Sequence, residues 1–230
     1  LDYETLYYFA VTAIDRSGNE STFSVQQSGK PLNTTSPSPP SGVNIAAENV
    51  DVPKINVYWA RNTEPDISHY NVYRALTVAG LDDSLHAFIT STFQEYYTDI
   101  NVEVGIIYYY KITAVDKENW ESPPSPIVSD RILHPVELIS PINYQYTGTQ
   151  PTFSWKAVEG AEKYVITLMS SRIGGEVWYT EVNKKITEIR YSGSNPLISG
   201  NTYYWRVGAV SKTEINSESK VGTFVVKTEH

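Results

Sequence analysis

Three stretches of the chain share one strand sequence, and this repeat constrains the fold more than any other feature. Residues 7–15 (YYFAVTAID) recur as residues 108–116 (YYYKITAVD) and, more loosely, as residues 203–211 (YYWRVGAVS). The first tyrosines are separated by 101 residues, from 7 to 108, and then by 95 residues, from 108 to 203. A period near 100 residues is too long for a solenoid repeat and equals one whole sandwich domain. The chain is therefore expected to consist of similar domains in tandem.

The amino-acid composition and the spacing of turn residues favour strands along the whole chain. The 230 residues include 18 Tyr, five Trp and six Phe, and aromatic and β-branched residues suit pleated, half-buried surfaces. Short apolar or alternating runs recur between Gly, Pro and Asn residues at the spacing that is typical of an antiparallel sandwich. No segment shows a helical period. The sequence predicts an all-β fold of tandem immunoglobulin-like β-sandwiches, with seven strands each, joined by short linkers.

The repeat also divides the chain into domains. Residues 1–32 predict two strands and a turn, the C-terminal hairpin of an incomplete domain, and residues 33–37 predict a linker. That linker lies in the Pro-rich stretch Pro31–Ser41, whose proline residues stiffen the backbone and remove hydrogen-bond donors. Residues 38–132 and 133–230 predict two complete domains. The chain thus opens inside a domain.

The predicted N-terminal hairpin has an apolar face that its own 32 residues cannot cover. Tyr7, Phe9 and Val11 alternate along its first strand, and an isolated hairpin is marginal in water. The face is expected to be covered by missing upstream strands, by another chain or by the neighbouring domain. Self-association or assembly through this hairpin is one expected consequence.

Six aromatic residues give the two complete domains the same pattern. Each has a tryptophan at the end of its second strand, a tyrosine early in its third strand and a tyrosine that opens its long repeated strand: Trp59, Tyr70 and Tyr108, then Trp155, Tyr164 and Tyr203. A leucine precedes the repeated tyrosine by six residues at Leu1 and Leu197, and Val102 takes its place before Tyr108.

This pattern resembles fibronectin type III domains along essentially the whole chain. The resemblance implies that the six aromatic residues form the structural core, and that the hydroxyl of the last tyrosine caps a backbone group. Residues 133–230 resemble a divergent, immunoglobulin-like variant. The phrase Ala13–Ser21 (AIDRSGNES) is similar to fibronectin type III domains of bacterial secreted and cell-surface proteins.

The residue types and motifs that form catalytic or metal sites are scarce in this chain. There is no cysteine, and the four histidines, at positions 69, 86, 134 and 230, are scattered without metal-ligand spacing. No phosphate-binding loop or nucleophile elbow occurs. The acids Glu64, Asp66, Asp82, Asp83 and Asp99 offer oxygen atoms that calcium could bind, but no convergent spacing is present, and the sequence predicts that they lie in solvated loops. We expect no catalytic, metal or cofactor-binding residue, no bound cofactor and no enzyme activity.

The net charge and the hydropathy of the chain limit the classes of partner that it can have. A net charge of −8 argues against nucleic acid as a partner. No apolar run approaches the length of about 20 residues that a membrane span needs. The protein or glycan partner, if there is one, is not identified by the sequence.

Three aromatic residues outside the expected core are candidate contacts with a partner or between domains. Trp120 occupies the turn after the second repeated strand, where the other repeats carry polar or small residues. Trp178 and Tyr179 are adjacent on an expected edge strand. Packing between domains, binding of a sugar or protein, and simple exposure remain open for all three.

These features favour a non-catalytic spacer or adhesion region of a larger extracellular protein, secreted or on a cell surface and of bacterial type. Two alternatives remain. One is a carbohydrate- or protein-binding domain that uses exposed aromatic residues, and the other is an accessory region of a secreted hydrolase.

Overall fold

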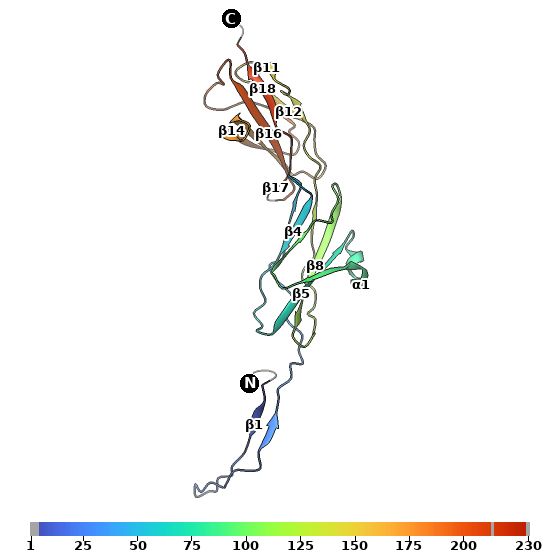
Figure 1. Cartoon of the computed structure of the whole chain (residues 1–230), viewed down its shortest axis with the longest axis vertical. Coiled ribbons are helices and arrows are strands. Elements are labelled where there is room, and N and C mark those ends of the chain that lie inside the picture. Colours follow the sequence, from blue (N-terminus) through green and yellow to red (C-terminus); the bar gives the residue numbers. More distant parts are fainter. Residues whose placement is uncertain (1–4, 213, 229–230) are drawn as a thin grey trace.

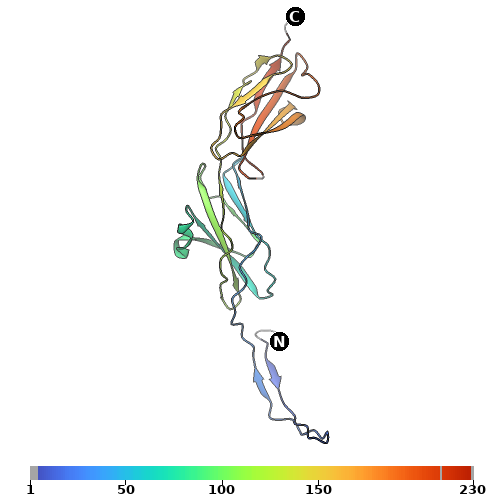
Figure 2. The same ribbon diagram turned by 180° about the vertical axis from the view of Figure 1, so that it is seen from behind.

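The computed structural model describes residues 5–212 and 214–228. Its parts follow one another along a single long axis: a hairpin, a middle sandwich and a C-terminal sandwich (Figures 1 and 2). The N-terminal hairpin pairs β1 (Tyr7–Phe9) with β2 (Gln27–Gly29), and its tip points away from the sandwiches. We call residues 38–132 the middle module and residues 133–228 the C-terminal module.

The middle module is a sandwich of seven strands. One sheet has the order β3-β4-β7 and the other has the order β6-β5-β8-β9, all antiparallel. The strands are β3 (Asn44–Glu48), β4 (Lys54–Tyr58), β5 (Ile67–Ala75), β6 (Phe88–Thr92), β7 (Tyr96–Asp99), β8 (Ile107–Asp116) and β9 (Val128–Arg131).

A short helical segment between β5 and β6 departs from the expected pattern. A 3₁₀ turn, η1 (Ala79–Leu81), precedes a one-turn helix, α1 (Ser84–Ala87), whose first turn is capped by the Asp83 carboxylate accepting from the His86 amide N at 3.3 Å. Leu81 and Ala87 are buried against Tyr73 on the outer face of the sheet. Four residues are too few to show a helical period, so the sequence pattern gives no sign of this turn within the all-β fold.

The C-terminal module has nine strands. Its sheets have the orders β10-β12-β15 and β11-β18-β16-β13-β14, with β17 also paired to β16. The strands are β10 (Leu138–Ser140), β11 (Gln145–Thr147), β12 (Thr152–Trp155), β13 (Lys163–Ser171), β14 (Gly174–Asn183), β15 (Glu188–Arg190), β16 (Thr202–Val210), β17 (Ile215–Glu218) and β18 (Gly222–Val226).

The strand count of this module exceeds the expected seven because two strands are interrupted. The first edge strand stops at Pro141, which has no backbone N–H to donate, and the chain crosses to the other sheet, where β11 runs parallel to β18. The last strand is interrupted between β17 and β18. The all-β, immunoglobulin-like fold class is confirmed, and the division of single strands is what the pattern missed.

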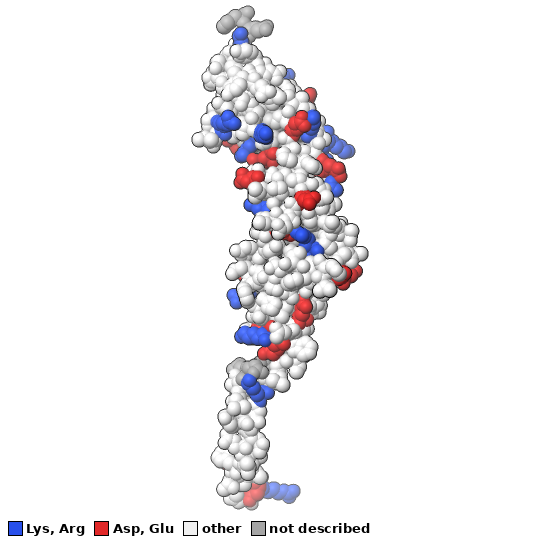
Figure 3. Space-filling view, turned by 45° about the vertical axis from the view of Figure 1, so that its right-hand side comes forward, with Lys and Arg blue, Asp and Glu red and all other residues white. Residues whose placement is uncertain are grey.

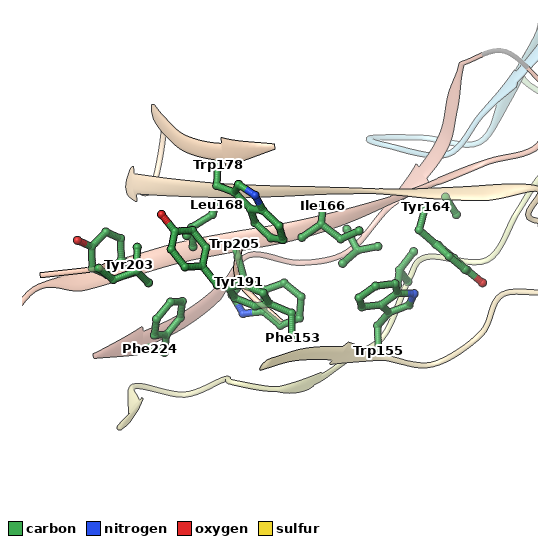
Figure 4. Packing of buried hydrophobic residues seen from close by; sticks show 14 of the residues in the cluster. Phe153, Trp155, Tyr164, Ile166, Leu168, Trp178, Tyr191, Tyr203, Trp205 and Phe224 are labelled. Carbon is green, nitrogen blue, oxygen red and sulfur yellow. The ribbon is translucent and has the colours of Figure 1, made fainter. Parts of the chain in front are cut away.

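Each module has its own hydrophobic core. In the middle module Trp59 packs edge-on against Tyr70 at 5.3 Å between ring centroids, and in the C-terminal module Trp155 packs edge-on against Tyr164 at 5.5 Å. Phe153, Trp178, Trp205 and Phe224 fill the C-terminal core between the sheets (Figure 4). The six repeated aromatic residues all lie in these two cores.

The repeated tyrosines also supply backbone caps. The Tyr108 hydroxyl accepts from the Glu103 amide N at 2.9 Å, and the Tyr203 hydroxyl accepts from the Ile198 amide N at 3.1 Å. This is the cap that the resemblance implied. Leu1, the leucine that precedes Tyr7, lies outside the described residues.

Candidate functional site

Of the three candidate contact residues, Trp178 belongs to the core. Its side chain is 9% exposed, stacks on Phe153 and meets Tyr191 edge-on (Figure 4). The strand β14 is an edge strand as expected, but alternate residues of an edge strand still face the core. Adjacent residues therefore point to opposite sides, and the expectation of a contact at Trp178 was wrong.

Trp120 and Tyr179 are about half exposed, at 49% and 48%. Trp120 follows the turn after β8, and its backbone N–H donates to Asp116, which also accepts from the linker residue Asn33. The Tyr179 hydroxyl donates to Glu181 at 2.6 Å, and its side chain lines a shallow groove where the two modules meet, together with Glu48 and Val50 of the middle module. Tyr179 thus lies at the junction of the modules.

The Pro-rich linker is bound to the middle module. The buried Asn33 amide donates from Nδ2 to Asp66 at 3.0 Å and to Asp116 at 2.7 Å. Further along, the Glu64 carboxylate accepts from the Ser38 amide N at 2.7 Å. The pKa of Glu64 is lowered to about 2, chiefly by the hydrogen bond from the Ser38 N–H and further by bonds from the Ser38 and Asn62 side chains. From Asn33 onward the linker is thus held by side chains of the module that follows it.

Sequence reasoning missed one acidic cluster beside this linker. Carboxylate oxygens of Asp66, Asp116 and Glu118 lie within 4.8 Å of one another. Asp116 is fully buried and accepts the amide N atoms of Glu118 and Trp120, while Asn33 bonds both aspartates. Three oxygens are fewer than the six to eight that calcium takes, and the Asn33 amide already donates hydrogen bonds to both aspartates. No spacing in the sequence could have revealed it, because the acids come from two different loops.

The other loop acids have separate roles. Asp99 is buried and pairs with Arg74 at 2.6 Å, and it also accepts the Tyr110 hydroxyl at 2.9 Å. Burial, followed by the Asp99 charge and this hydrogen bond, raises the pKa of Tyr110. Asp99 therefore holds the sheets of the middle module together.

The junction between the two modules is the most elaborate polar arrangement in the described chain, and its central feature is a pair of adjacent residues. Ile132 is buried in the core of the middle module, and Leu133 is buried in the core of the C-terminal module. The Ile132 carbonyl accepts from the Gly105 amide N at 2.7 Å, which ties it to the middle module. A single peptide bond therefore joins the two cores, and no linker residue lies between them.

The fully buried Asn216, on β17, connects the C-terminal module to this segment. Its Oδ1 accepts from the Leu133 amide N at 2.8 Å, and its Nδ2 donates to the Arg131 carbonyl at 2.7 Å. Its own carbonyl accepts from the Asn49 amide N at 2.5 Å. Asn49, just beyond β3, donates from Nδ2 to the Leu133 carbonyl at 2.9 Å and forms a parallel β-bridge with Ser217. These bonds link β3 of one module to β17 of the next.

Two further contacts cross the junction at its surface. Lys212 donates to the Ser129 carbonyl, and Arg131 pairs with Glu159 at 2.6 Å. Gly160 has a φ of +88°, and a Cβ there would lie 3.0 Å from the Leu133 side chain. The turn at Gly160 therefore depends on glycine both for its backbone conformation and for its close approach to the junction.

The arrangement is suited to fixing two modules in one orientation.

Among the residues that the structure describes, no helix has the length and apolar character that a membrane span requires. Sequence reasoning found the linker region but missed this junction, since the bonds that Asn49 and Asn216 make across it join residues more than 80 positions apart. The only signal was the pair of apolar residues Ile132 and Leu133 at the expected domain boundary.

Comparison with known proteins finds likeness in fold and none in sequence. No protein-family model matches the chain, and no curated protein matches it. Among solved structures, the crystal structure of the FN1–FN3 domains of chicken CNTN1 is similar, with a TM-score of 0.51 and 12% identity. The match covers 96% of this chain and 78% of that chain. The chain thus has a fibronectin type III-like fold.

Proposed function

We propose that this chain is a non-catalytic spacer or adhesion region of a larger extracellular protein, secreted or on a cell surface and of bacterial type. The observation that carries the proposal is the junction, where Ile132 and Leu133 enter opposite cores across one peptide bond. Domains that are linked flexibly do not need a buried asparagine network at the joint between them. A spacer that holds other domains at a fixed distance and angle requires one.

Nuclear spin relaxation tests this proposal on the whole chain. If the joint is rigid, backbone amides of the middle and C-terminal modules fit one common rotational diffusion tensor. A matched variant carries Gly-Gly-Ser between Ile132 and Leu133, which restores flexible linkage. We expect the modules of this variant to tumble with separate, shorter correlation times. Native modules that already tumble independently would remove the basis for a spacer.

A second candidate, the binding of a carbohydrate or a protein, rests on Trp120. Its ring is half exposed and is not part of either core, and exposed aromatic rings are favoured contacts with sugars and with protein partners. Glycan-array binding by the whole chain that is lost in Trp120→Ala, but kept in the equally exposed Tyr179→Ala, would support this role. The same glycan binding by the native chain and by both variants would contradict this role for Trp120 and would favour the spacer proposal.

A further inference from the structure

The N-terminal hairpin repeats the β8–β9 hairpin of the middle module contact for contact, at a constant offset of 101 residues. Tyr7 pairs with Gly29 as Tyr108 pairs with Asp130, and the next two pairs of each hairpin correspond in the same way. An isolated antiparallel bridge closes each turn, Ile14 with Glu20 and Val115 with Glu121. The two hairpins therefore share one register along their whole length.

The side-chain hydrogen bonds of the two hairpins also correspond. An aspartate opens each turn and accepts two backbone N–H groups through Oδ1, at Asp15 and at Asp116. Two serines between the turn and the second strand of each hairpin accept backbone N–H groups from the opposite arm: Ser21 and Ser24 in one hairpin, Ser122 and Ser125 in the other. A threonine donates to a glutamate across each turn, from Thr12 to Glu20 and from Thr113 to Glu121, at 2.5 Å in both.

The two hairpins differ in what covers them. Tyr110 and Ile112 of β8 are 0% exposed, whereas their counterparts Phe9 and Val11 are 50% and 70% exposed. From residue 5 to residue 29 the only charged side chains are Asp15, Arg16 and Glu20, all in or beside the turn. The flanks of the hairpin are accordingly free of charge on the face that Figure 3 shows. The N-terminal hairpin thus has the surface of a buried hairpin.

The middle module shows which structure covers such a hairpin. β5 pairs with β8 along its free edge, and the sheet β3-β4-β7 packs on its apolar face through Ile45, Ile55, Val57 and Trp59. Strand β5 also supplies donors to the repeated glutamate, because Asn71 and Tyr73 donate to Glu121 at 3.1 and 2.6 Å. These four strands, together with β6 on the far edge of β5, are the five covering strands, and all of them precede β8 in the chain.

We propose that the N-terminal hairpin is the docking surface for a five-stranded half-sandwich of the same kind, which precedes it in a longer polypeptide. One strand of that partner runs antiparallel to residues 8–15 and carries hydrogen-bond donors opposite Glu20. Its second sheet covers Tyr7, Phe9, Val11 and Ala13. A second copy of this chain is not the occupant, because its own five covering strands are already engaged by β8 and β9.

The chain itself provides a probe for this surface. Residues 38–101, which hold the five covering strands of the middle module, are fused directly before Leu1 of the whole chain, so that the spacing of the middle module is reproduced. Hydrogen exchange of the amides of residues 8–15 is then expected to slow at least about tenfold, as strands enter a cooperative unit. The control fusion carries Val11→Asp, whose carboxylate would occupy the position of the buried Ile112. We expect it to restore the exchange rates of the unfused chain.

A second variant tests the equivalence without a fusion. In the whole chain, five substitutions give β8 the residues of the N-terminal hairpin: I107L, Y110F, K111A, I112V and V115I. The middle module is expected to keep its strand exchange protection and to melt cooperatively. Unchanged exchange of residues 8–15 in the first fusion, or an unfolded middle module in the substituted chain, would overturn the proposal.

Discussion

Tyrosine hydroxyls close the loops of both modules at equivalent places. In addition to Tyr108 and Tyr203, the Tyr70 hydroxyl accepts from the Asn62 amide N at 3.0 Å, and the Tyr164 hydroxyl accepts from the Val158 amide N at 2.8 Å. Each of the four rings is buried while its hydroxyl reaches a loop amide. The same structural device is therefore present twice in each of the two modules.

Replacing Tyr164 by Phe tests this device. The ring is kept, but the Val158 N–H loses its acceptor, and a buried donor without a partner costs about 1–3 kcal/mol. We expect the C-terminal module to lose about 1 kcal/mol in free energy of unfolding, measured by urea denaturation. The control Tyr144→Phe removes an exposed hydroxyl and should change nothing measurable. Equal stability of the two variants would show that the hydroxyl of Tyr164 has no structural role.

The carboxylate of Glu64 makes attachment of the linker dependent on pH. Its pKa falls from an ordinary value of 4.5 to about 2 when the linker is bound. A carboxyl group with a depressed folded pKa stabilises the folded state above its unfolded pKa, and this contribution is lost as the pH falls. The loss is expected between pH 4.5 and pH 2.

Exchange of the Ser38 amide, followed over this pH range and corrected for intrinsic rates, measures the effect. In the native chain its protection should fall as the pH drops through this window. In Glu64→Gln, which has no charge to lose, protection should be lower at pH 5 and nearly constant down to pH 2. A pH profile that is the same in both proteins would contradict the role of Glu64.

Among the elements, strands and turns could be predicted from the sequence, and interruptions and long-range polar contacts could not. The repeated strand and the turn after it follow from local pattern, because alternation and turn residues act within a few positions. The core role of the tryptophans and tyrosines was implied by the resemblance to fibronectin type III domains. The one-turn helix at Ser84–Ala87 is too short to show a period. The burial of Trp178 depends on the side of β14 that meets the core, and the strand's first half is exposed on both sides. The junction depends on Asn49 and Asn216, which lie far apart in sequence.

At the level of elements, the last hairpin of each module contacts the segment of chain that enters that module. The β8 turn of the middle module bonds the linker before it through Asp116 and Asn33, and the segment after β16 bonds residues 131–134 through Asn216 and Ser217. Each module thus fixes the chain that enters it by using its last hairpin.

Substitution of Asn216 by Ala tests this element directly. The Leu133 N–H and the Arg131 carbonyl would lose their partners at a buried site, at a cost of about 1–3 kcal/mol for each unsatisfied group. We expect the Leu133 amide to exchange at least about tenfold faster. Amides of β8 and β13, which are remote from this contact, should keep their rates. Faster exchange throughout the C-terminal module would instead show that Asn216 stabilises the whole sandwich and not the joint.

For the whole molecule, the architecture is an extended row of modules in which the joint between the two sandwiches is built like a core. Polar side chains bond the backbone on both sides of Ile132 and Leu133, and apolar side chains fill the cores on each side. The groove beside Tyr179 and the ion pair between Arg131 and Glu159 lie at its rim. The orientation of the modules is thereby part of the folded structure.

The distance between the two modules, measured by electron spin resonance on a doubly labelled chain, tests this claim most directly. The chain has no cysteine, so Thr98→Cys on β7 and Glu188→Cys on β15, both exposed, place spin labels without competing thiols. We predict one narrow distance distribution in the native chain and a broad one when Gly-Gly-Ser separates Ile132 from Leu133. A native distribution as broad as that of the insertion variant would contradict the rigid joint, and with it the proposed spacer.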